Sequence, residues 1–139
     1  MGVANITNNI LIDSNITIAH GTYTPTLTLV GNAIGSVAIS VCLYTRVGNL
    51  VTVTGSISGT GSGTGIQQYS YELSLPITQT NTNLRGTATG SGQVIGGIGT
   101  NGLNGFQFNT NKMLLEFQSL NTFTGAGLFW NFTFTYEIA

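Results

Sequence analysis

Residues 39–58 read ISVCLYTRVGNLVTVTGSIS and contain the clearest structural signal in the chain. Apolar residues occupy alternate positions on both sides of Gly48-Asn49, a period that is typical of strands with one buried face. The alternating apolar residues are Ile39, Val41 and Leu43 before the pair and Val51, Val53 and Ile57 after it. A Gly-Asn pair between two such runs predicts a two-residue hairpin turn.

The same period continues outward from this hairpin. Further alternating runs cover residues 22–29, which contain Pro25, and residues 69–75, 113–117 and 130–136. The last run places Trp130, Phe132, Phe134 and Tyr136 on one face and Asn131, Thr133 and Thr135 on the other. No segment sustains the 3.6-residue period of a helix. About eight strands without a helix predict an all-β fold, an antiparallel jelly-roll sandwich.

Residues 86–105 hold eight glycines, and Asn101-Gly102 and Asn104-Gly105 add turn signals. We expect turns here, with short strands at residues 87–89, 94–95 and 106–108.

Charged residues are rare: three Lys or Arg and four Asp or Glu among 139 residues. Arg46, Arg85 and Lys112 are too few and too scattered to neutralise nucleic-acid phosphates or to bind an anionic membrane surface. No stretch approaches the roughly 18 apolar residues of a membrane span, and residues 1–15 lack a signal-peptide pattern. A net charge of −1 gives little repulsion between molecules, so this surface suits a protein that lives in an assembly.

Residues that could carry chemistry are equally sparse. Residues 97–102 match G-x-G-x-x-G, but turn and strand residues follow where a dinucleotide site needs a helix. One His and one Cys cannot build a zinc site, and a carbonyl-rich calcium site stays open. A catalytic triad would need His20 and Asp13. Carboxylates for sugar hydrolysis could come only from Glu72, Glu116 and Glu137, at polar positions of alternating strands. We therefore expect no cofactor, no metal and no enzymatic activity.

Five pieces of the chain, in order, resemble a known family. They are residues 21–28 (GTYTPTLT), 44–55 (YTRVGNLVTVTG), 75–77 (LPI), the glycine-rich residues 86–105, and 130–136 (WNFTFTY). They resemble the C-terminal head domain of bacteriophage and large-virus tail or head fibres. The resemblance implies a jelly roll similar to the C1q and tumour-necrosis-factor heads, assembled as a homotrimer on the virion surface. It implies attachment to the host, often through glycans, and it supplies no catalytic residue; Arg46 is expected to serve structure.

On this interpretation residues 20–139 are the head domain and residues 1–19 are a lead-in. We expect the lead-in to join the trimer to a capsid or baseplate protein through Ile6, Ile10 and Ile12. Loops at residues 59–68 and 96–104 are the predicted ligand sites, because glycine lets a ligand approach the backbone closely. The predicted ligand residues are Gly63, Gly65, Gln68, Tyr69, Gly97 and Asn101. The predicted core or three-fold contact residues are Tyr44, Trp130, Phe132, Phe134 and Tyr136.

Three alternatives stay open. The trimer could have a purely structural role, capping a position on the capsid without touching a receptor. The chain could be a secreted lectin-like carbohydrate-binding module, monomeric or dimeric. It could also be a carbohydrate depolymerase that depends on Glu72 or Glu116.

Overall fold

The computed structural model describes residues 16–30, 34–61, 65–80, 85–95, 100–122 and 125–138. Within these ranges the regular elements are β-strands, and their pairings are antiparallel. The strands are β1 (Ile18–Tyr23), β2 (Leu27–Leu29), β3 (Ile34–Ile39), β4 (Cys42–Val47), β5 (Leu50–Gly61), β6 (Gly65–Ser74), β7 (Gly86–Ile95), β8 (Thr100–Phe108), β9 (Lys112–Thr122) and β10 (Gly127–Glu137). The all-β prediction is confirmed.

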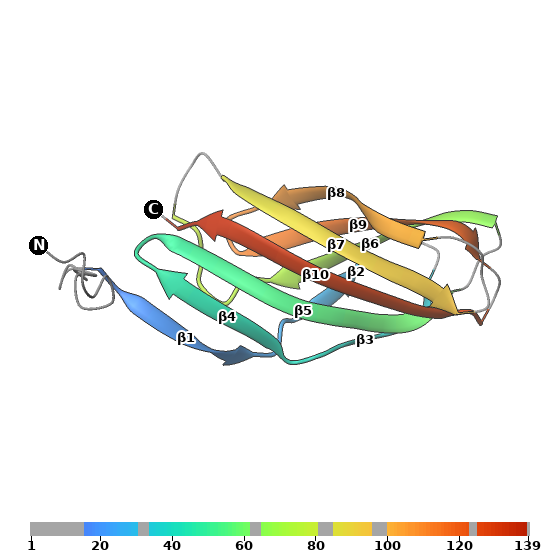
Figure 1. Ribbon diagram of the computed structural model, residues 1–139, viewed down its shortest axis with the longest axis horizontal. Coiled ribbons are helices and arrows are strands. Elements are labelled where there is room, and N and C mark those ends of the chain that lie inside the picture. Colours follow the sequence, from blue (N-terminus) through green and yellow to red (C-terminus); the bar gives the residue numbers. More distant parts are fainter. Residues whose placement is uncertain are drawn as a thin grey trace, which may run out of the picture.

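The strands form one curled sheet that folds into two facing layers (Figure 1). The order of paired strands is β1-β4-β5-β10-β7-β8-β9-β6-β2, and β3 pairs with β5 beside that path. We call β1, β3, β4, β5, β10 and β7 layer one, and β8, β9, β6 and β2 layer two. The β7–β8 pairing joins residues 91–93 to residues 100–102, where the sheet passes from one layer to the other.

β10 lies between β5 and β7 in layer one, and its even-numbered side chains face layer two. Trp130, Phe132, Phe134 and Tyr136 are at most 2% exposed. Their partners on β7 are Gly92, Gly90, Ala88 and Gly86, in that order. On the other side, Phe132 lies opposite Gly55 of β5, where a Cβ atom would come within 2.7 Å of the Phe132 ring. Large aromatic side chains thus have small neighbours, whose missing side chains leave room for the rings.

The aromatic side chains of β10 also connect the two layers. The indole Nε1 of Trp130 donates a hydrogen bond to the Tyr71 hydroxyl at 3.0 Å. Its ring stacks on Phe117, with the ring centroids 4.7 Å apart. Further along, Phe108 meets Phe134 edge-on at 6.1 Å. Stacked and edge-on pairs add stability beyond the burial of their area, so this cluster holds the layers together.

The predicted hairpin is confirmed. Strands β4 and β5 pair up to Val47 and Leu50, and the turn falls at Gly48-Asn49, where Gly48 has a φ of 60°. Arg46 donates a hydrogen bond from Nε to the Gly48 carbonyl oxygen at 2.7 Å, so its side chain supports the turn.

The strand before the turn differs from the predicted pattern. Residues Ser40 and Val41 separate β3 from β4, and both strands pair with β5. The Ser40 hydroxyl donates to the carbonyl oxygen of Ser56, and the Ser56 backbone N–H donates back to that hydroxyl. This break shifts the alternation by one residue. Cys42 is therefore fully buried, while Leu43 is 60% exposed.

The glycine-rich stretch is mostly strand. Its described residues form β7 and β8, which include the three short strands predicted within it. The Asn-Gly pairs at 101–102 and 104–105 lie inside β8, so they do not form the expected turns. Tertiary pairing with β7 and β9 overrides the local turn preference of these pairs.

Packing against β10 makes Gly92 intolerant of a side chain. A Cβ atom there would overlap the Trp130 ring and the Phe129 carbonyl oxygen. We expect Gly92→Ala to lower the free energy of unfolding by about 1–3 kcal/mol, the usual cost of overpacking. Gly102→Ala is the matched control, because the nearest atom to its Cβ would be 3.9 Å away. Denaturant unfolding measures both, and equal effects of the two changes would contradict the packing argument.

Buried phenols predict a loss of stability at alkaline pH. Burial raises the pKa of Tyr136, whose hydroxyl donates to the Ile77 carbonyl oxygen at 2.7 Å, to about 12. The unfolded chain loses this proton near pH 10, whereas the folded chain keeps it. The free energy of unfolding therefore falls as the pH rises from about 10 towards 12. Denaturant unfolding at about pH 8 and about pH 11 measures the fall, which should be smaller in Tyr136→Phe. An equal fall in this variant would show that other groups cause it.

Candidate functional site

The two predicted ligand loops are largely strand where the structure describes them. Gly63 and Gly97 lie outside the described residues. Gly65 is the first residue of β6, and Asn101 pairs with Gly92 in the β7–β8 ladder. These residues therefore belong to the sheet and do not form an apical loop.

Gln68 and Tyr69 also belong to β6, and the alternation of the strand separates them. Gln68 is exposed, whereas Tyr69 is fully buried with its ring 5.8 Å from that of Trp130. Tyr69 is thus a core residue and is not available to a ligand. Its position beside a glycine loop suggested a ligand role, but the period of the strand outweighs that position.

The residues predicted for the core or a three-fold contact are placed unequally. The four aromatic residues of β10 lie in the core of the single chain, while Tyr44 is half-buried and meets Tyr23 edge-on at 6.2 Å. The predicted anchor residues Ile6, Ile10 and Ile12 lie outside the described residues. Since β1 begins at Ile18, the predicted boundary between residues 19 and 20 falls inside a strand.

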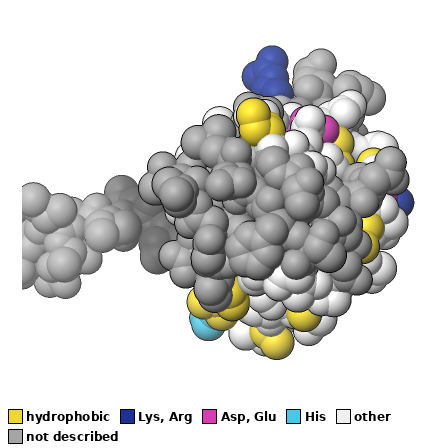
Figure 2. All heavy atoms as spheres, turned by 90° about the vertical axis from the view of Figure 1, so that its right-hand side faces the viewer, with side chains coloured by type: hydrophobic (Ala, Val, Ile, Leu, Met, Phe, Trp, Pro, Cys, Tyr) yellow, Lys and Arg dark blue, Asp and Glu magenta, His cyan; other side chains and the backbone are white. Residues whose placement is uncertain are grey.

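An exposed apolar row crosses one end of layer one. Ile18 pairs with Val47, which pairs in turn with Leu50, and these side chains are 55%, 58% and 53% exposed. We call these three residues the apolar row. Figure 2 views the molecule from its other end and shows hydrophobic side chains exposed there beside the histidine, which is His20 of β1. Contiguous apolar side chains at a surface are typical of an interface, so the row is a candidate interface.

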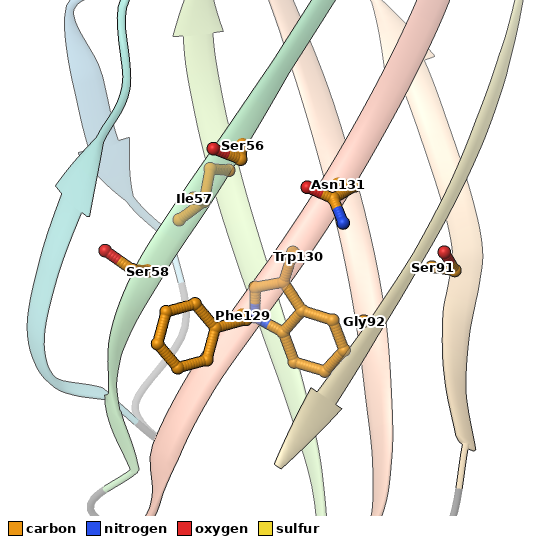
Figure 3. A pocket seen from close by; sticks show the side chains of 8 residues that line it. All are labelled: Ser56, Ile57, Ser58, Ser91, Gly92, Phe129, Trp130 and Asn131. Carbon is orange, nitrogen blue, oxygen red and sulfur yellow. The ribbon is translucent and has the colours of Figure 1, made fainter. Parts of the chain in front are cut away.

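The outer face of β10 forms a second candidate surface, a groove between β5 and β7. Three hollows of about 570, 450 and 320 Å³ follow one another along the strand. The largest is lined by Ser56, Ile57, Ser58, Ser91, Gly92, Phe129, Trp130 and Asn131 (Figure 3). We call the three hollows together the outer groove and the largest of them the first hollow.

Hydroxyl groups in the middle of the outer groove bond to each other across the strands. Thr52 and Thr135 have their hydroxyl oxygens 3.0 Å apart, and Thr54 and Thr133 have theirs 3.3 Å apart. In each pair one hydroxyl donates its proton and the other accepts it, without any ligand. Threonine pairs across neighbouring strands also stabilise the sheet itself.

The first hollow differs, because polar groups there are free. Among the described residues the side chains of Ser58, Ser91 and Asn131 have no hydrogen-bond partner. The Phe129 ring lies two residues from Asn131 on the same face of β10 and is 45% exposed. Ser56 donates its proton to the Ser40 hydroxyl at 3.0 Å and keeps acceptor capacity. The hollow therefore combines an open aromatic ring with unpaired neutral donors and acceptors.

Charge is confined to the edges of this surface. Among the described residues, the first and second hollows have no charged lining residue, and the third has Arg85 and Glu137. On layer two, the Glu72 carboxylate accepts an ion-paired hydrogen bond from Lys112 at 2.6 Å. The described residues contain no group of three His, Cys, Asp or Glu side chains placed to hold a metal ion.

The described part of the chain contains no helix long and apolar enough to cross a membrane.

Known proteins offer no direct guide to this surface. No family model matches the chain, and no curated protein or solved structure matches it either. The resemblance to viral fibre heads therefore stays a prediction.

Sequence reasoning missed the first hollow, although part of its signal was present. The alternation of residues 130–136 already placed Asn131 on the face opposite the aromatic residues. The sequence did not show that Ser58 and Ser91 would flank this strand, because both pairings join segments distant in the chain. A search for polar residues opposite the aromatic face would have found Asn131.

Proposed function

We propose that this chain is a viral structural protein, the trimeric head of a virion spike or fibre or a capsid-decorating protein, involved in host attachment. The observation that carries the proposal is the apolar row on a nearly uncharged protein. Ile18, Val47 and Leu50 expose more than half of each side chain to water. Copies of the chain packed around this face would remove that apolar surface from water.

The strand pairing supports the jelly-roll part of the proposal. β5 pairs with β10, and β6 pairs with β9. The consecutive strands β5 and β6 therefore lie along the consecutive strands β9 and β10. β7 and β8 continue on the far side of β10 and β9. Consecutive strands that alternate between two facing layers in this way are typical of a jelly roll.

The pieces of sequence that carry the resemblance form a hairpin, a strand and a contact that help to hold this fold together. The 44–55 piece contributes to the β4–β5 hairpin, whose turn is supported by Arg46. The 130–136 piece forms most of β10. The 75–77 piece is held to the end of that strand by the bond between Tyr136 and Ile77. These positions explain why such residues would recur together in one fold.

Attachment through such a protein would depend on avidity. Three weak sites on one trimer, or many trimers on one particle, bind a surface far more tightly than one site does. The charge-poor surface leaves little long-range attraction to guide binding. Repeated short-range contacts are therefore the mechanism that the composition favours.

A secreted lectin-like module is the second candidate, and the first hollow is the observation that favours it. An open ring beside unpaired neutral polar groups suits a carbohydrate whether or not the chain assembles. The two functions differ in oligomeric state, since the module would act as a monomer or dimer. The mass of the protein in solution therefore separates them.

We expect light scattering to give about three times the 14.5 kDa of one chain. Ile18→Lys and Val47→Lys should each lower this mass, because an unpaired lysine in an interface costs several kcal/mol. Gln118→Lys is the control, since Gln118 is exposed on layer two. A monomeric wild-type protein would overturn the proposal in favour of the lectin-like module. An unchanged mass in both row variants would show that the row is not the interface.

A further inference from the structure

We infer that the first hollow of the outer groove binds a neutral saccharide. The inference rests on the proposed function, because it names the ligand through which an attachment protein would engage a surface. It places the site on the sheet face around Phe129 and Asn131, and not on the predicted apical loops. Its volume of about 570 Å³ lies in the range of small-molecule sites.

Hydrogen-bonding capacity is the first argument. The Asn131 amide can donate two protons and accept at its oxygen, and the hydroxyls of Ser58 and Ser91 can each donate and accept. They come from three adjacent strands, with Asn131 on the middle one (Figure 3). Sugar hydroxyls also donate and accept, so this set matches a polyhydroxylated ligand and does not match a purely apolar one.

The exposed ring of Phe129 is the second argument. A sugar ring has one face of C–H groups, which can pack on an aromatic ring while its hydroxyls reach polar neighbours. Phe129 and Asn131 are two residues apart on one face of a strand, a separation of about 7 Å. One pyranose ring lying on Phe129 could therefore present a hydroxyl to Asn131.

The lack of charge in the first hollow is the third argument, and it selects the class of sugar. No cation lines this hollow, so a sialic acid or sulfated sugar would lose water from its charge without gaining a counter-ion. A neutral saccharide carries no such penalty. The charged groups of Arg85 and Glu137 lie at the other end of the groove.

The site stays accessible if the apolar row is an interface. Leu50 of the row and Ser58 of the hollow are eight residues apart on β5, which corresponds to about 26 Å. An interface confined to the end of layer one that carries the row would leave the first hollow open, and one trimer would then present three such sites.

Saturation-transfer NMR on the full chain tests the inference with lactose, maltotriose and triacetylchitotriose as neutral probes, and with 3′-sialyllactose as the charged counterpart of lactose. We expect at least one neutral probe to bind, and sialyllactose to bind no better than lactose. Phe129→Ala and Asn131→Ala should each weaken that binding by about tenfold or more. Gln118→Ala should leave it unchanged, because its side chain is exposed on layer two.

Two results would overturn the inference: no binding of any neutral probe, or binding that survives both variants while their melting temperatures stay at the wild-type value. Phe129 and Asn131 are exposed, so the variants are expected to fold. Light scattering on the same samples separates this test from that of the proposed function. A monomer whose saccharide binding depends on Asn131 would overturn the proposed trimer and support the saccharide site. A trimer that binds no neutral probe would support the proposed trimer and overturn the saccharide site.

Discussion

The row of aromatic side chains on β10, packed against glycine and alanine on β7, is the constraint on which the rest of the structure depends. On the β5 side Trp130 and Phe134 lie opposite Ile57 and Val53, so the room for these rings comes from β7, which supplies Gly92, Gly90 and Ala88 opposite Trp130, Phe132 and Phe134. The space that these residues leave empty is filled from layer two as well, where the Phe117 ring lies close to Gly90 and stacks on the Trp130 indole. The glycines are therefore a packing requirement, although glycine in a strand costs backbone entropy.

This arrangement determines what remains for the outer face of layer one. With its aromatic residues on the inner face, β10 presents Asn131, Thr133 and Thr135 outward, between Phe129 and Glu137 near its two ends. The pairs Thr52–Thr135 and Thr54–Thr133 satisfy each other across β5 and β10. Where this pairing ends, at Phe129 and Asn131, polar groups become free and a hollow opens. The candidate site is thus the place where the hydroxyl pairing of the sheet stops.

Local sequence patterns predicted what short-range geometry controls. The Gly48-Asn49 turn, the alternation of β10 and the absence of helices in the described residues follow from residue types within a few positions. The turns expected in the glycine-rich stretch do not form, because its described glycines lie within the strands β7 and β8. Small residues occupy every second position from 86 to 92 in β7, namely Gly86, Ala88, Gly90 and Gly92, and this spacing becomes meaningful only beside the aromatic residues of a strand some 40 positions away. The break at Ser40 depends likewise on a bond to Ser56, which no local pattern announces. The predicted ligand loops lie where glycine is frequent. The first hollow is instead formed by three strands, β5, β10 and β7, that are distant from one another in the sequence.

The scarcity of charge, which first marked this sequence, follows from having both candidate surfaces on one sheet face. A charge within the apolar row would be buried without a partner once copies assembled, and that burial is costly. A charge within the first hollow would hold water or counter-ions where a neutral ligand must lie. Neutral hydroxyl and amide groups meet both demands, since they stay soluble in water and can be buried when hydrogen-bonded. The composition is what would be expected of a strand pair that served assembly at one end and recognition at the other, as proposed above.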